Sequence, residues 1–237
     1  MKKILYVLIC ISILSCSQNL KLNTEVNSIS AMKNVMWKGE LEAKVKLDTL
    51  QPKTGLFGIG PLEGLSGEIT IYDGQVYVST INDDNLIEVK INPEVGAPFF
   101  VYANAYVFEE INLPKAVSNL KQLNDFLSKK YDRKHAYVFK LIGEIQSGKI
   151  HVQNLPPNTK VSSPKEAHQG QVDFEIGKTA VEMIGFYSNS AKGIYTHHDT
   201  NIHVHLISQD KNMMGHCDEV IFNSDDVKLY LATTPNS

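Results

Sequence analysis

Arginine is almost missing from this sequence of 237 residues. Arg133 is the only arginine among 23 basic side chains. Lysine, which supplies the other positive charges, is a point charge and does not reproduce the two-pronged hydrogen bonding of a guanidinium group. The net charge is −3, so basic side chains are not in excess and the composition gives no reason to expect nucleic acid as a partner.

Cysteine is also scarce, with three residues in the chain. Cys10 and Cys16 lie in a leader-like segment, which leaves Cys217 alone in the remainder. A single cysteine excludes an internal disulfide, so the fold depends on its hydrophobic core. Cys217 follows His216, and neighbours on a strand face opposite sides, which favours a buried apolar position for Cys217 over a role as metal ligand.

Long apolar runs are lacking as well. After Lys2 and Lys3 comes an apolar run over 4–14, which is too short for a stable membrane span and fits a secretory signal. It ends at Ser15-Cys16, and a small residue directly before a cysteine resembles a bacterial lipoprotein cleavage site. We therefore expect residues 1–16 to be a lipoprotein signal peptide, Cys16 to carry the lipid, and the protein to be an exported lipoprotein of the cell envelope. A periplasmic or secreted protein with an ordinary signal peptide is the alternative.

The rest of the chain divides simply. Residues 17–31 are polar and are expected to be a tether, so that the membrane is contacted through the N-terminal lipid only. No low-complexity linker interrupts residues 32–237, which predicts one domain with closely packed halves and a soft boundary near residue 132.

Alternation of apolar and polar residues dominates this domain and predicts about ten or more strands, against one clear helix over 113–130 that Ser118 can cap. The clearest hairpin has its two-residue turn at Asp73-Gly74. Further strands are expected at 38–47, 86–91, 99–108, 135–145, 149–155, 171–176, 179–186, 220–223 and 227–232. The predicted fold class is α+β and strand-dominated, with mixed or antiparallel sheets in two closely packed halves and few helices.

A candidate metal site lies near the C-terminus. His203 and His205 are two residues apart on a predicted strand and therefore point to the same face. A turn centred on Asp210 and Lys211 puts His216 opposite His205, where directly opposed Cβ atoms are roughly 4.5–5.5 Å apart. Three imidazoles around one point make a three-histidine metal site whose fourth position is open to water or substrate. The alternative is three surface histidines on a hairpin.

Two stretches carry recognisable motifs. The first is glycine-rich and leads into Asp73-Gly74; it is not a phosphate-binding loop, because no helix and no Gly-Lys-Ser/Thr follow. The second holds the histidines, with ten residues between His205 and His216. The motifs in chain order are Phe57-Gly58-Ile59-Gly60, Leu65-Ser66-Gly67-Glu68-Ile69, Ala97-Pro98-Phe99, Phe139-Lys140-Leu141-Ile142-Gly143, Gly185-Phe186-Tyr187-Ser188, Lys192-Gly193-Ile194, His203-Val204-His205 and Gly215-His216. Together, over roughly residues 32–225, they resemble the bacterial α-acetolactate decarboxylase family.

The resemblance implies a zinc enzyme that converts 2-acetolactate to acetoin with loss of carbon dioxide, a step of the acetoin and butanediol pathway. It implies that Zn²⁺, or another divalent metal, is held by His203, His205 and His216, and that Glu68 relays the proton that completes the product. A divalent ion can chelate the adjacent hydroxyl and carbonyl oxygens of a 2-hydroxy-3-keto acid and act as a Lewis acid when carbon dioxide leaves. The expected partner is therefore a small 2-hydroxy-3-keto acid as substrate. The sequence leaves open whether the protein forms a homodimer.

Two departures from the family pattern concern the substrate side of the site. The family has an arginine that can pair with the substrate carboxylate; alignment from Gly143 puts His151 at its place, with Lys149 two residues earlier on the same face. His151 and Lys149 are therefore the candidates for substrate binding. The family's C-terminal glutamate has no counterpart in residues 231–237, and the last glutamate is Glu219.

These departures leave other functions open. One alternative is a metal-binding lipoprotein of the same fold that has lost the reaction or acts on another 2-hydroxy-3-keto acid. A cupin-like metal protein is disfavoured, because cupins have a glutamate four or five residues after His-X-His, where this chain has Gln209 and Asp210. His197 and His198 precede the hairpin and are either solvated or at the rim of the pocket.

Overall fold

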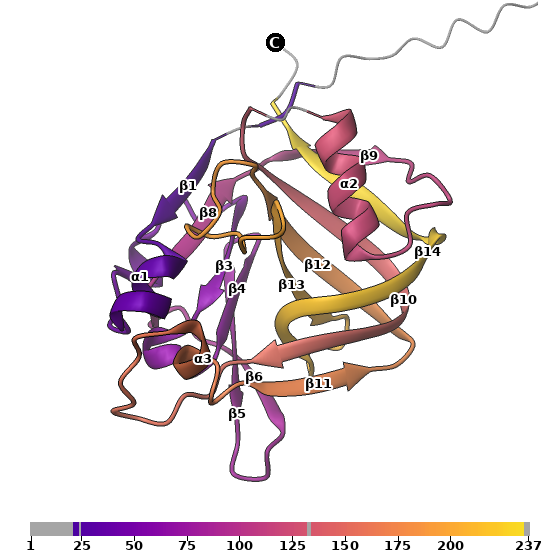
Figure 1. Ribbon diagram of the computed structural model, residues 1–237. Coiled ribbons are helices and arrows are strands. Elements are labelled where there is room, and N and C mark those ends of the chain that lie inside the picture. The colour runs from indigo at the N-terminus through magenta and orange to yellow at the C-terminus, as the bar shows by residue number, and fades with distance from the viewer. Residues whose placement is uncertain (1–20, 24, 132–133, 235–237) are drawn as a thin grey trace, which may run out of the picture.

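The computed structural model describes residues 21–23, 25–131 and 134–234, which form two large antiparallel sheets and a small one (Figure 1). The first sheet has the order β1 (Val26–Ile29), β8 (Phe100–Asn104), β3 (Leu56–Pro61), β4 (Glu68–Tyr72), β5 (Gln75–Ile81) and β6 (Ile87–Ile91). The second has the order β11 (Val172–Ile176), β10 (Tyr137–Val152), β12 (Thr179–Tyr187), β13 (Ile202–Ser208), β14 (Met214–Thr233) and β9 (Val107–Ile111). The small sheet pairs β2 (Val45–Lys46) with β7 (Gly96–Ala97).

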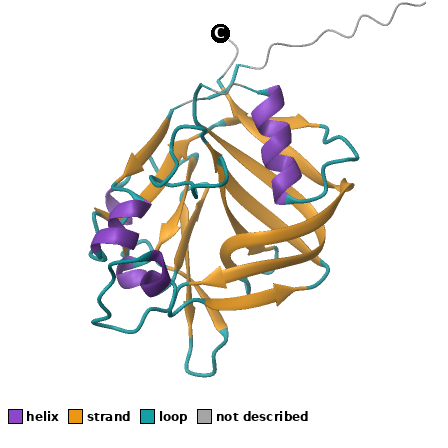
Figure 2. Cartoon of the chain, in the orientation of Figure 1, coloured by secondary structure: helices purple, strands orange, loops and turns teal. Residues whose placement is uncertain are grey.

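The α-helices of the described chain lie outside the sheets (Figure 2). They are α1 (Met32–Lys38), α2 (Leu120–Lys130) and α3 (Pro164–Ala167), and short 3₁₀ turns occur at Leu47–Thr49 and Glu63–Leu65. Helix α2 covers the second sheet through the buried side chains of Leu123 and Leu127, whereas α1 and α3 lie side by side beside the first sheet.

The second sheet closes on itself. Strands β10 and β14 pair with each other in addition to their other neighbours, so β10, β12, β13 and β14 form a ring. Three register shifts along the β10–β14 ladder accompany the wide curve of β14 in Figure 1. Such bulges add local twist and bend a strand, which a closed ring requires.

The two large sheets pack against each other through a shared apolar layer. Phe57 and Ile59 of β3 contact a cluster that includes Ile184 and Phe186 of β12. The predicted strand-dominated fold with two closely packed halves is confirmed by this arrangement. The layer also brings the start of β4 next to the faces of β13 and β14 that carry histidines.

The Asp73-Gly74 hairpin is confirmed, and the predicted helix is shorter than expected. Both turn residues have positive φ, 47° and 83°, as a two-residue turn of this kind needs. The helix begins at Leu120, not at 113, and Asn119 caps it by accepting a 2.9 Å hydrogen bond from the Gln122 amide. Ser118, the predicted cap, instead donates to the side chain of Gln122.

Four predicted strands, 135–145, 149–155, 220–223 and 227–232, belong to only two continuous ones, β10 and β14. The gap left between the predicted strands 135–145 and 149–155, at Gln146-Ser147-Gly148, is not a turn, because Gly148 is paired with β11 on one side and β14 on the other. The polar and glycine residues of this gap are accommodated as register shifts within the ladder.

The N-terminal part of the domain also differs from expectation. Strand β1 lies inside the predicted tether 17–31 and pairs with β8, so ordered structure begins before residue 32. The segment 38–47, predicted as a strand, contributes only β2, and the unpredicted helix α1 ends at Gly39, whose left-handed φ of 64° suits a helix terminus. The chain passes from the first sheet to the second between β8 and β9, earlier than the boundary predicted near 132, because α2 already packs on the second sheet.

The predicted signal peptide with Cys16, and also Arg133, lie outside the described residues. Of the helices that the structure describes, none has the length and apolar character that a membrane-spanning helix needs.

Candidate metal centre

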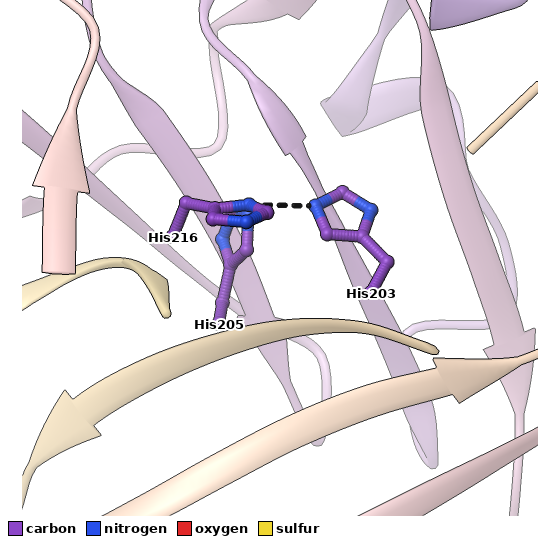
Figure 3. Close-up of side chains that lie close together, drawn as sticks. All are labelled: His203, His205 and His216. Atoms are coloured by element: carbon purple, nitrogen blue, oxygen red, sulfur yellow. Dashed lines mark hydrogen bonds between the residues drawn. The ribbon is translucent and has the colours of Figure 1, made fainter. Parts of the chain in front are cut away.

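Three histidines converge on the hairpin of β13 and β14 (Figure 3). The predicted register is confirmed: His205 is directly opposite His216, and His203 lies on the same face of β13 as His205. Nε2 of His203 is 3.1 Å from Nδ1 of His216. Each of the three rings offers a nitrogen within 4.8 Å of the others, so one ion could contact all three.

Burial keeps these imidazoles uncharged. It lowers the pKa of His205 to about 3, with the neighbouring His151 acting in the same direction. Burial likewise lowers the pKa of His203 and of His216 well below the usual value, and nearby histidines add to both shifts. A neutral imidazole has a free nitrogen lone pair, which is the form that binds a metal.

His205 shows most directly that the site suits a ligand. Its Nδ1 lies 3.1 Å from the hydroxyl of Thr70 on β4, while its Nε2 is buried without a hydrogen-bond partner in the described structure. Leaving such a nitrogen unpaired costs about 1–3 kcal/mol, a cost that a metal bond to Nε2 would remove. Thr70 would then orient a metal ligand from behind, as outer-sphere partners do. Three neutral nitrogen donors fit zinc and other divalent ions that favour imidazole.

Glu68 faces this group from the other sheet, since it begins β4. One carboxyl oxygen is 3.7 Å from Nε2 of His205, and the other accepts a 3.4 Å hydrogen bond from the backbone of Gln153. The residue is 3% exposed. Burial raises the pKa of Glu68 well above its usual value, and the nearby Asp218 carboxylate adds to the rise. Glu68 can therefore hold a proton next to the three histidines.

The two candidates for substrate binding have different surroundings. His151 is buried and pairs with His216 across the β10–β14 ladder, where the two rings stack with centroids 4.6 Å apart. Its Nδ1 is 2.8 Å from the carboxylate of Asp218. Lys149, in contrast, forms a 2.7 Å ion pair with Asp173 and does not line the cavity at the histidines. The structure thus brings His151 to the site and leaves Lys149 out of it.

Two cavities meet at the histidines. The inner one, of about 30 Å³, is lined by Glu68, His151, His203 and His216, and it has room for about two water molecules or for a small polar group of a larger ligand. The outer one, of about 480 Å³, lies under α2 and ends at His216 and Asp218. Of the two alternatives for the histidines before the hairpin, His197 takes the place at the rim, because it lines both cavities, whereas the exposed His198 lines neither.

Thr70 and Asp218 are site residues that sequence reasoning missed. Each follows a predicted site residue by two positions, Thr70 after Glu68 and Asp218 after His216. Alternation along a strand was therefore a usable signal for Thr70, whereas Asp218 lies in a bulge of β14, where regular alternation is interrupted. The pattern of one strand does not predict the residue that each side chain contacts, because Thr70 contacts His205 and Asp218 contacts His151, each on another strand.

Comparisons with known proteins bear on the family and the fold of the chain. Residues 27–236 match the family model "Alpha-acetolactate decarboxylase". The alpha-acetolactate decarboxylase of Methanosarcina mazei is 27% identical over 178 residues, which are 74% of this chain and 59% of that protein. The one from Lactococcus lactis subsp. lactis is 23% identical over 179 residues, 75% of this chain and 72% of that protein. The crystal structure of alpha-acetolactate decarboxylase from Bacillus subtilis strain 168 has a TM-score of 0.71 at 20% identity, over 89% of this chain and 86% of that chain.

Proposed function

Because the chain belongs to the alpha-acetolactate decarboxylase family, we propose that it is a metal-dependent decarboxylase that converts 2-acetolactate to acetoin and carbon dioxide. The observation that carries the proposal is the meeting of three buried, uncharged histidines with the carboxyl group of Glu68. The chain spans 59% of the length of the Methanosarcina relative, so the proposal concerns the catalytic site alone.

His203, His205 and His216 would hold the metal ion. A bound divalent ion would supply Lewis-acid polarisation of the adjacent hydroxyl and carbonyl oxygens of a 2-hydroxy-3-keto acid. The protein itself contributes the fixed positions of the metal-binding side chains. The three imidazoles are fixed on one hairpin, and Thr70 holds His205 so that Nε2 faces the site. A fixed geometry of this kind spares the protein the reorganisation that a flexible site would need during reaction.

Glu68 is the candidate for the proton step. When carbon dioxide leaves, the carbon that carried it must gain a proton to give acetoin. Burial raises the pKa of Glu68 in the metal-free protein, and its carboxyl group lies against the metal-binding histidines. It would donate that proton to the carbon and take one back from water afterwards. Gln153 keeps the carboxyl group in place through its backbone amide.

One observation favours a second candidate, a metal-binding protein of the same fold that acts on another 2-hydroxy-3-keto acid or on none. Among the described residues that line the inner cavity there is neither lysine nor arginine, and the outer cavity has Lys121 as its one basic residue of these two types. Lys149 is paired with Asp173, and His151 is bound to the carboxylate of Asp218. A substrate carboxylate would therefore meet a weaker cationic partner here than a guanidinium group.

Metal analysis and an acetoin assay distinguish the acetolactate decarboxylase from the second candidate. Zinc-loaded protein should contain one ion per chain and release acetoin from racemic acetolactate. His203→Ala should lose both, whereas His198→Ala, which changes an exposed histidine next to the site, should lose neither. An unchanged metal content in His203→Ala would refute the metal centre. Zinc-loaded protein that makes no acetoin above the spontaneous background would favour the second candidate.

Glu68→Gln tests the proton step. This variant keeps the shape of the side chain and removes its acidic proton, so we expect turnover to fall by about 10²- to 10⁴-fold. Its metal content should stay at one ion per chain. Turnover near that of the unchanged protein would exclude Glu68 as the proton donor.

A further inference from the structure

The pair formed by His151 and Asp218 has a geometry that the metal centre does not use. Both oxygens of Asp218 lie close to Nδ1 of His151, at 2.8 and 2.9 Å. The imidazole of His151 is buried and stacks on His216 with an angle of 24° between the ring planes. His151 is thus fixed by a carboxylate at one nitrogen and by a ring on one face, which leaves Nε2 as the nitrogen that can meet a ligand.

A bulge in the sheet makes this contact. Along the β10–β14 ladder Lys149 pairs with Glu219 and Ile150 with Cys217, so the residue between them on β14, Asp218, has no partner on β10. A bulged residue is turned away from its regular direction. In this bulge the carboxylate of Asp218 reaches His151 instead of standing opposite Ile150.

The carboxylate decides which nitrogen of His151 carries hydrogen. A carboxylate only accepts hydrogen bonds, so Nδ1 must carry hydrogen and donate it to Asp218. In the neutral ring this leaves Nε2 as an acceptor. His151 lines the inner cavity together with Glu68, so Nε2 of His151 is an acceptor on the wall of this cavity.

We propose that Asp218 is a positioning residue that holds His151 with Nε2 as the acceptor for the hydroxyl hydrogen of the substrate. The hydroxyl part rests on the proposed function, because a 2-hydroxy-3-keto acid carries one hydroxyl donor beside a carbonyl acceptor. A hydroxyl bound in this way is oriented for contact with the metal-binding histidines, since His151 lies against His216. His151 touches the substrate, and Asp218 acts through His151.

The hydrogen position can be measured directly by ¹⁵N NMR of histidine-labelled, zinc-loaded protein without substrate, with His151→Asn to assign the signals. We expect hydrogen on Nδ1 and none on Nε2. In Asp218→Asn an amide hydrogen can replace the acceptor, so the ring hydrogen should move to Nε2. Glu219→Gln, which removes one negative charge from the next residue of β14, is the matched control and should leave the signals unchanged.

Activity gives the second measurement. Asp218→Asn should lower kcat for acetolactate by about 10- to 100-fold, the effect typical of residues that orient a site group, with the metal content unchanged at one ion per chain. Asp218→Glu should recover part of the loss. If the protein makes no acetoin, the proposed function fails, and the NMR result still decides the positioning of His151.

Three results would overturn the proposal. The first is hydrogen on Nε2 of His151 in the unchanged protein, and the second is a hydrogen position that Asp218→Asn leaves unaltered. The third concerns metal: ligand atoms of His151, His216 and Asp218 also lie within 4.8 Å of one another. Two ions per chain, with the second lost in Asp218→Asn, would assign these residues to a second metal site instead.

Discussion

Acid should destabilise the metal-free protein through its buried histidines, and His205 allows the size of the effect to be worked out. The pKa of His205 is about 3 in the folded protein, whereas an unfolded chain has a histidine pKa of about 6.5. Between these values the unfolded chain binds a proton that the folded protein does not. The free energy of unfolding must therefore fall as the pH drops below 6.5, and His205 contributes no such change above it.

Each pKa unit of difference corresponds to about 1.4 kcal/mol, so His205 alone should lower the free energy of unfolding by about 2 kcal/mol between pH 6.5 and pH 5. Burial shifts the pKa of His203 and His216 in the same direction, and both add to the loss. Glu68 acts in the opposite direction, because its pKa is raised in the folded protein and acidification relieves the cost of burying it as a carboxylate. The free energy of unfolding of the whole protein changes with pH by the sum of these four contributions. A comparison with a variant of one residue is needed to isolate the contribution of that residue.

The assay is urea unfolding of chelator-treated protein, followed by circular dichroism at pH 7.5 and pH 5. His205→Asn keeps a polar group facing Thr70 but does not titrate, so it should lose about 2 kcal/mol of the acid-induced decrease. His198→Asn, at an exposed position, should behave like the unchanged protein. Equal acid-induced decreases in His205→Asn and in the unchanged protein would refute the argument that burial keeps His205 neutral.

Further predictions concern the proton on Glu68 and the packing around the site. Glu68→Gln removes the opposing contribution, so the acid-induced decrease of the metal-free protein should become steeper in the same urea experiment. Gly185→Ala should lower the free energy of unfolding by about 1–3 kcal/mol, because the new Cβ would stand 2.1 Å from the ring of Phe139, while Gly177→Ala, with no atom within 4 Å, should be tolerated. Asn119→Ala should cost about 1 kcal/mol through loss of the α2 cap, and Asn119→Asp, which keeps an acceptor, should restore most of it in thermal unfolding.

The metal hairpin could be predicted because its information is local. Alternation puts His203 and His205 on one face, and a symmetric turn fixes His216 opposite His205. Nothing local connects these residues with Thr70, which lies 135 positions before His205 in the chain. Glu68 was found through the family motifs and not through spacing, since only the packing of two sheets brings it to the histidines.

The two substrate-binding candidates show the limit of reading one strand at a time. Lys149 and His151 are two residues apart on β10. The family alignment made His151 a candidate for substrate binding, and alternation added Lys149 on the same face. The carboxylates that they contact belong to different strands. Lys149 forms an ion pair with Asp173 on β11, and His151 forms a hydrogen bond with Asp218 on β14. The contact between His151 and Asp218 depends on a bulge in β14. This bulge is set by how β14 pairs with β10, so it could not be predicted from the order of residues along β10. Since each residue is matched to its own carboxylate, a substrate entering this site would meet His151 and Asp218 as one unit, and would gain no free lysine from Lys149.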